Sequence, residues 1–271
     1  MYFSVREPTN GETPVVVEVP HAGLYLDAQT LATVTAPAYS IARDADLYVD
    51  DLYTDAPAEG ATLLVSHVSR YVCDLNRGEH DFDGLAVEGG AASRVAPHGL
   101  IWRRTTDDRP ALDGPLPRDE LERRLDSVYR PYHRTLRELL QRKRERFGFA
   151  VLLCGHSMPS RGRSGHADPG RDRADVVPGS RGRTTAVAAV IDSPGLVAAE
   201  LDLSVRHDEP YRGGFSTHHY GRPKDGYHAL QVELARRLYM HEQHLYKKTK
   251  EFEATRLFCR TLVARLGGLK L

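Results

Sequence analysis

The sequence predicts a single α/β domain with a mixed, mostly parallel sheet that is flanked by helices. Short apolar runs bounded by Gly or Pro read as buried strands, and helical patterns alternate with them along the chain. Neither an internal repeat nor a linker divides the 271 residues. We therefore expect residues 1–271 to form one domain.

The predicted elements follow one another closely along the chain. Strands are expected over 15–19, 61–65, 70–75, 149–154, 203–207 and 229–234, and helices over 27–34, 43–56, 117–147, 185–201 and 243–266. Gly60 ends the second helix, as Gly does just past a helix C-terminus. Pro131 predicts a kink in the longest helix. Residues 160–183 are rich in Arg, Gly, Asp and Pro and predict an extended loop over the site.

Composition excludes several classes of protein. The 37 basic and 37 acidic residues cancel, so net charge gives no support to binding of nucleic acid or of a membrane surface. No apolar run approaches the ~20 residues that a membrane-spanning helix requires. The three cysteines lack CxxC spacing and favour a reducing compartment. We expect a soluble, cytoplasmic protein.

Two of the predicted strands run into a histidine. The run 15–19 leads to Pro20 and His21, and the run 149–154 leads to Gly155 and His156. Ligands of open α/β sheets bind beyond the carboxyl ends of the strands. Either histidine alone is more simply a structural residue, but the two together, with a carboxylate, match the ligands of a catalytic zinc.

The carboxylate is expected on the helix that follows the first strand, where Asp44, Asp46, Asp50 and Asp51 cluster. Asp46 and Asp50 are four residues apart and would share a helix face. One could bind the metal while the other orients a histidine ligand. Spacing does not choose between them, and an acidic helix start stabilised by the helix dipole is the alternative for Asp44.

Arginines flank the predicted strand 70–75. Arg70 and Arg77, with Asn76 beside the second, supply forked donors suited to a substrate carboxylate. Surface ion pairs with Asp74 or Glu79 are the alternative.

A glutamate interrupts the apolar strand 229–234. Strand alternation places Gln231 and Glu233 on one face, and Leu230, Val232 and Leu234 on the other. Burying a carboxylate is costly unless it has a partner or a task, such as accepting a proton from a metal-bound water. The alternative is an exposed position on an edge strand. The Gly-hinged aromatic segment 210–220 just upstream is either a lid or a turn.

Several of these motifs resemble, in their order, the N-formylglutamate amidohydrolases. They are Pro20-His21-Ala22-Gly23, Asp44-Ala45-Asp46, residues 69–77, Gly155-His156-Ser157-Met158-Pro159-Ser160, Tyr211-Arg212-Gly213-Gly214 and Leu230-Gln231-Val232-Glu233. The resemblance extends from Val15 to Glu242. It implies a fold similar to that of the zinc carboxypeptidases. The implied reaction is zinc-dependent hydrolysis of N-formyl-L-glutamate to formate and glutamate, the last step of one histidine-degradation route.

The resemblance also implies roles for single residues. The metal, Zn²⁺ or another divalent ion, would be bound by His21, His156 and Asp46, with Asp50 in reserve as the carboxylate ligand. Glu233 matches the general base and Arg70 a catalytic or carboxylate-binding arginine. Asn76 and Arg77 match a pair that holds a substrate carboxylate, and Tyr220 is a further expected substrate contact.

The His-x-x-Glu motif of the carboxypeptidases is absent, because Leu24 stands where its glutamate would be, so the metal carboxylate must come from farther along the chain. Residues 178–181 depart from the family pattern: they read Pro-Gly-Ser-Arg where an acidic residue is expected, so the acyl or amino-acid portion recognised could differ. Hydrolysis of another N-acyl amino acid or a small peptide is therefore an alternative. A non-catalytic dicarboxylate-binding protein and a nucleic-acid-binding protein are the rivals from other classes.

Overall fold

The computed structural model describes residues 1–89, 97–164 and 166–271. Its centre is a six-stranded sheet of order β1-β3-β2-β4-β6-β5. The strands are β1 (Phe3–Arg6), β2 (Val15–Val19), β3 (Thr62–Ser66), β4 (Ala150–Met158), β5 (Val176–Gly179) and β6 (Tyr227–Ala235). The four inner strands are parallel, and β1 and β5 are antiparallel edges. The predicted single-domain α/β fold with a mostly parallel sheet is confirmed.

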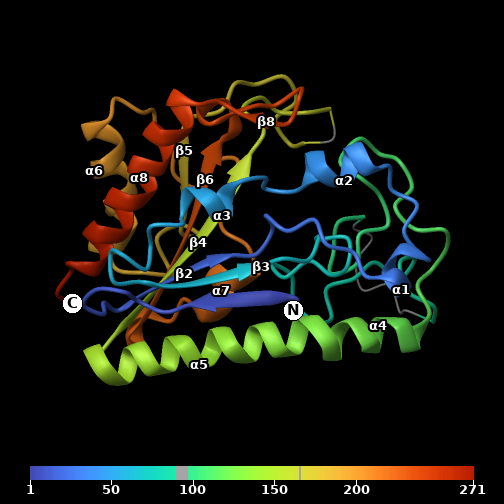
Figure 1. Cartoon of the computed structure of the whole chain (residues 1–271), viewed down its shortest axis with the longest axis horizontal. Coiled ribbons are helices and arrows are strands. Elements are labelled where there is room, and N and C mark those ends of the chain that lie inside the picture. Colours follow the sequence, from blue (N-terminus) through green and yellow to red (C-terminus); the bar gives the residue numbers. More distant parts are fainter. Residues whose placement is uncertain (90–96, 165) are drawn as a thin grey trace.

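Helices cover both faces of the sheet (Figure 1). They are α1 (Ala28–Leu31), α2 (Ala38–Asp44), α3 (Val49–Leu52), α4 (Arg118–Arg124), α5 (Arg130–Phe147), α6 (Ala188–Glu200), α7 (Phe215–Tyr220) and α8 (Lys250–Gly267). The long α5 lies along one face, and α6 and α8 lie on the other. Strand residues alternate between the two apolar layers: Val15, Val17 and Val19 pack in one layer and Val16 in the other.

The predicted kink at Pro131 takes the form of a π-helical turn. Residues Leu125–Tyr129 join α4 to α5, and the N–H of Arg130 donates to the carbonyl of Leu125, five residues back. Pro131 has no N–H to donate, so the regular bonding pattern cannot continue through this turn. The helix accommodates the missing N–H of Pro131 with this one wider turn and continues into α5 without a break.

The expected helix over 43–56 is wrong. It is two helices, because α2 ends at Asp44 and α3 begins at Val49, with Tyr48 between them in the left-handed region at φ 68°. Asp46 therefore lies in a turn and not on a helix face shared with Asp50.

The expected strand over 70–75 is also absent, and a turn takes its place. The side chain of Asp74 accepts a hydrogen bond from the N–H of Asn76 at 2.9 Å, a local bond that competes with strand pairing.

The segment 160–183, expected as a loop, contains the buried strand β5; residue 165 lies outside the described part. Pro178 is tolerated there because β5 is an edge strand. Over 203–207 only a bridge between Val176 and Val205 forms. The last helix begins at Lys250 because the hairpin β7 (Met240–His241) and β8 (Tyr246–Lys247) precedes it.

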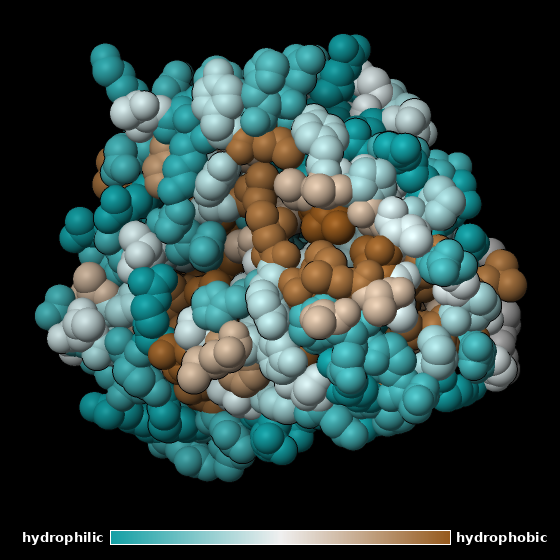
Figure 2. Space-filling model, turned by 45° about the vertical axis from the view of Figure 1, so that its right-hand side comes forward, coloured by the Kyte–Doolittle hydropathy of each residue, from teal (hydrophilic) through white to brown (hydrophobic). Residues whose placement is uncertain are grey.

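The described residues include no helix long and apolar enough to cross a membrane. Figure 2 turns the right-hand side of Figure 1 forward and shows apolar side chains gathered in the middle of this face, within a mostly hydrophilic surround.

A substitution at Gly155 tests how tightly β4 is packed beside His156. A Cβ at this position would lie 2.5 Å from Cε2 of the buried Tyr53 ring, so Gly155→Ala forces the ring or the strand to move. We expect the free energy of unfolding to fall by about 1–3 kcal/mol, measured by urea denaturation. Gly114→Ala is the control, because its Cβ would meet nothing within 4 Å. Equal stability of the two variants would contradict this packing.

Candidate metal centre and substrate cavity

A cavity of about 340 Å³ opens beside the carboxyl ends of β2, β4 and β6. His21, His156, Asp46 and Glu233 lie in its wall, together with arginines from several loops. The sequence-based expectation that the two histidines meet at this edge of the sheet is therefore correct: their ring centroids are 5.0 Å apart.

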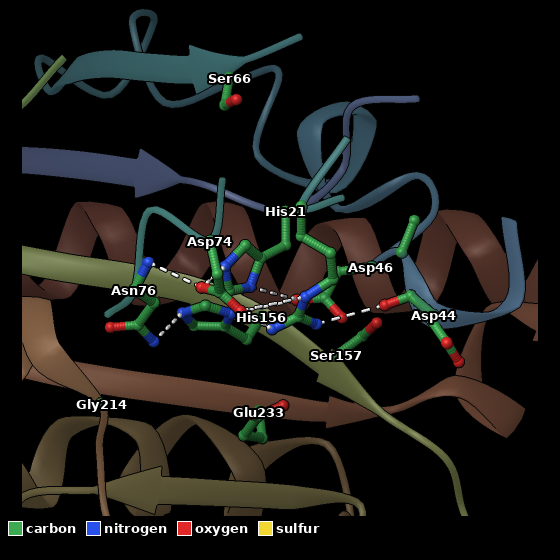
Figure 3. A network of polar contacts seen from close by, with 12 residues as sticks. His21, Asp44, Asp46, Ser66, Asp74, Asn76, His156, Ser157, Gly214 and Glu233 are labelled. Atoms are coloured by element: carbon green, nitrogen blue, oxygen red, sulfur yellow. Dashed lines mark hydrogen bonds and ion pairs between the residues drawn. The ribbon is translucent and has the colours of Figure 1, made fainter. Parts of the chain in front are cut away.

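Three side chains point their ligand atoms at one another (Figure 3). Oδ2 of Asp46 lies 3.0 Å from Nδ1 of His156 and 3.6 Å from Nδ1 of His21. One ligand atom from each residue fits within a span of 4.8 Å. Two imidazoles and a carboxylate are suitable ligands for a divalent metal ion, so these three residues fit the metal that the sequence motifs imply.

The backbone and a buried arginine hold Asp46 in position. Its N–H donates to the carbonyl of His21 at 2.9 Å, which ties the turn to the end of β2. Arg236, just after β6, donates to Oδ1 of Asp46 at 3.2 Å and to the carbonyl of Ala45 at 2.6 Å. Burial raises the pKa of Asp46, but its bonds to the two histidines outweigh burial and leave the pKa well below its usual range.

Asp74 holds His21 from the opposite side of the ring. Its Oδ1 lies 2.7 Å from Nε2 of His21. Its Oδ2 accepts hydrogen bonds from Arg70 at 2.8 Å and from Nε1 of Trp102 at 3.1 Å. Although burial raises the pKa of Asp74, the charges of Arg70 and His21 hold it well below the usual range. A carboxylate behind a ligand histidine fixes the orientation of its ring.

Sequence reasoning treated Asp74 only as a possible surface partner of an arginine. The sequence does contain a sign of this role: Asp74 directly follows the apolar run Val72-Cys73, and a carboxylate is costly to bury without partners.

Arg70 is engaged by these neighbours. Besides Asp74, it donates to the carbonyl of Asp44 at 3.2 Å and lies over the ring of Trp102, 4.3 Å from its centroid. The alternative interpretation, an ion pair with Asp74, is therefore what the structure shows for Arg70.

Asn76 positions His156. Its Nδ2 lies 3.3 Å from Nε2 of His156 and 3.3 Å from Oε1 of Gln231, while its Oδ1 accepts from the N–H of Ser216 at 3.0 Å. Arg77 lies in the cavity wall and donates to the carbonyls of His98 and Asn76. No ion pair joins Arg77 to a carboxylate in the described part of the chain.

Glu233 faces the metal ligands from the neighbouring strand. It stands directly opposite His156 in the pairing of β4 and β6, and its Oε1 accepts from Gln231 at 2.9 Å. Leu230, Val232 and Leu234 pack in the opposite apolar layer, so the predicted alternation is correct. Burial, with a contribution from the charge of Asp46, raises the pKa of Glu233 to about 7.

Two predicted residues lie apart from this cluster. Tyr220, expected to contact substrate, is buried in the apolar layer beside α5, with its hydroxyl 3.0 Å from Nδ1 of His133. The tyrosine of this segment that lines the cavity is Tyr211. Asp50 lies on α3 and is not one of the convergent ligands.

Fold and site together define a class: an α/β protein whose parallel strands end at a candidate metal centre of two histidines and one carboxylate, with a glutamate opposite. Within this class, the chain belongs to the N-formylglutamate amidohydrolase family, which matches residues 13–240. The family predicted from the sequence motifs is thereby confirmed.

Known proteins resemble this chain over nearly its whole length. The N-formylglutamate deformylase of Pseudomonas aeruginosa is 33% identical over 259 residues, which cover 94% of this chain and 93% of that protein. The N-formylglutamate deformylase of Pseudomonas putida is 32% identical, covering 86% and 84%. The crystal structure of N-formylglutamate amidohydrolase from Ralstonia eutropha has a TM-score of 0.89 at 30% identity, covering 98% and 97%.

Removing the charge of Asp74 tests its role in the site. In Asp74→Asn the partly buried Arg70 loses its carboxylate partner, so we expect the free energy of unfolding to fall by about 2–4 kcal/mol in urea denaturation. The control is Asp108→Asn, which breaks an exposed ion pair with Arg104 and should leave stability nearly unchanged. Asp74→Asn with wild-type stability would show that this ion pair is not required.

Proposed function

We propose that this protein is a zinc-dependent amidohydrolase that cleaves N-formyl-L-glutamate to formate and L-glutamate. The observation that carries the proposal is the convergence of His21, Asp46 and His156 beside Glu233. Membership of the family and the two related deformylases support the choice of substrate. In this proposal the reaction is the last step of a histidine-degradation route, and the protein is cytoplasmic, in keeping with three buried free cysteines.

His21 Nδ1, His156 Nδ1 and Asp46 Oδ2 would hold the metal. Asp74 leaves Nδ1 of His21 directed at the site because it engages Nε2 of the same ring. When bound, zinc supplies a Lewis acid and lowers the pKa of a water molecule.

Glu233 is the proposed proton carrier. Its carboxylate accepts the proton of the attacking water, and the water oxygen bonds to the formyl carbon. Glu233 then returns the proton to the departing nitrogen as the C–N bond breaks. Its buried position directly opposite His156 places this carboxylate beside the proposed metal ligands.

Asn76 and Arg77 are the proposed site for the α-carboxylate. Asn76 touches His156, and Arg77 keeps one guanidinium nitrogen, Nη2, beyond the two bound to backbone carbonyls. Arg70 acts in this proposal through Asp74: it keeps that carboxylate ionised and thereby orients His21.

Replacing Glu233 by Gln should lower kcat for formate release from N-formyl-L-glutamate about 10²- to 10⁴-fold, because the amide cannot carry the proton. Circular dichroism and urea denaturation establish that the variant is folded. Glu209→Gln, an exposed change, is the control and should retain the wild-type rate. A fully active Glu233→Gln variant would refute the assigned role.

Metal removal tests the ligand set. The purified protein should contain one zinc per chain by elemental analysis, lose formate release on dialysis against a chelator and regain it with Zn²⁺. His21→Ala and His156→Ala should each lose the metal, whereas His218→Ala, at an exposed position of α7, should retain it. Full activity in rigorously metal-free protein would exclude this mechanism.

A further inference from the structure

The arginines in the cavity wall fall into two groups. The described residues that line the cavity include Arg43, Arg70, Arg77, Arg163, Arg212 and Arg236. Four of them face a carboxylate oxygen: Arg43 pairs with Asp107, Arg70 with Asp74, Arg163 with Asp44 and Arg236 with Asp46, at 2.7–3.4 Å. Arg77 and Arg212 have no such partner in the part of the chain that the structure describes. Neither guanidinium group is neutralised by a carboxylate of that part of the chain, and Arg77 keeps Nη2 beyond its two bonds to backbone carbonyls, so both can bind an anionic ligand.

The backbone around Arg212 is fixed. The carbonyl of Arg212 accepts from the N–H of Arg181 at 2.8 Å, and the N–H of Gly214 donates to Oε1 of Gln231 at 2.9 Å. Between these anchors Gly213 has φ 98°, a conformation that side-chain-bearing residues rarely adopt. The backbone of Arg212 is therefore already ordered before a ligand binds, which lowers the entropy cost of binding.

The same segment lies against the proposed reaction centre. Gly214 passes so close to Asn76 that a Cβ on it would stand 2.3 Å from Nδ2 (Figure 3). Asn76 in turn touches His156, and Gln231 touches Glu233. Arg212, two residues before Gly214, therefore borders the cavity on the β6 side of the site, and Arg77 directly follows Asn76.

We propose that Arg212 binds the side-chain carboxylate of the substrate amino acid and so makes the enzyme selective for an acidic side chain. The inference rests on the proposed function, in which Asn76 and Arg77 hold the α-carboxylate. N-formyl-L-glutamate carries two carboxylates, and the cavity offers two arginines that have no carboxylate partner among the described residues. Arg212 thereby takes the second carboxylate in place of Arg70, whose donors are directed at Asp74 and a backbone carbonyl and whose guanidinium lies over the ring of Trp102.

The test compares N-formyl-L-glutamate with N-formyl-L-glutamine, which has the same shape but a neutral side chain. In Arg212→Met, kcat/KM for N-formyl-L-glutamate should fall about 10- to 100-fold, as expected for loss of a hydrogen bond to a charged group. The kcat/KM for N-formyl-L-glutamine should change little, so the preference for glutamate over glutamine disappears in this variant. Arg212→Lys should restore part of it. Arg77→Met should lower both values together, because the α-carboxylate is common to both substrates.

Binding measured without turnover separates this inference from the proposed reaction. Calorimetric titration of both formyl amino acids into Glu233→Gln, with and without Arg212→Met, reports selectivity even if the wild type releases no formate. Selectivity for glutamate that depends on Arg212 supports the inference whatever the activity. Undiminished selectivity in the Arg212→Met background, or an equal loss for both ligands, overturns it. Arg206→Met is the matched control, because this exposed arginine, slightly earlier in the chain, is not among the residues that line the cavity.

Discussion

The site depends on one buried carboxylate, Asp74, which is fully shielded from solvent. It joins Arg70 and Trp102 on one side to His21 on the other. A buried carboxylate is tolerated only with strong partners, and a cation and several N–H donors supply them here. Because Oδ1 of the same carboxylate engages Nε2 of His21, the bonds that stabilise this charge at Oδ2 also help to direct Nδ1 of His21 toward Asp46.

A second set of contacts prepares the other half of the site. Asn76 links the turn after Asp74 to His156 and, through Gln231, to the strand that carries Glu233. Arg236 binds the turn of Asp46 to the end of that strand. The candidate ligands therefore come from three separate segments, and each is oriented by a neighbouring side chain: His21 by Asp74, Asp46 by Arg236 and His156 by Asn76. Such support holds a catalytic group in one geometry before substrate arrives.

Much of the fold and of the candidate site could be predicted from the sequence, because these parts depend on local patterns of residues. The apolar runs gave the inner strands, and the alternation around Glu233 placed its side chain correctly. The turn at Asp46 was missed because it depends on a left-handed Tyr48 and on a bond to the distant His21 carbonyl. The partners of Arg70 and Tyr220, which are Asp74 and His133, are likewise set by tertiary packing and leave no local pattern in the sequence. Spacing alone could not tell a free arginine from a paired one.

The central claim is that His21, Asp46 and His156 form one metal site. Crystals grown with Zn²⁺ and measured at the zinc absorption edge test it most directly. The account predicts a single strong anomalous peak bound by Nδ1 of both histidines at about 2.0–2.1 Å and by a carboxylate oxygen of Asp46. A peak bound by Asp50 or Asp74 in place of Asp46, or no peak between the two histidines at saturating zinc, would contradict it.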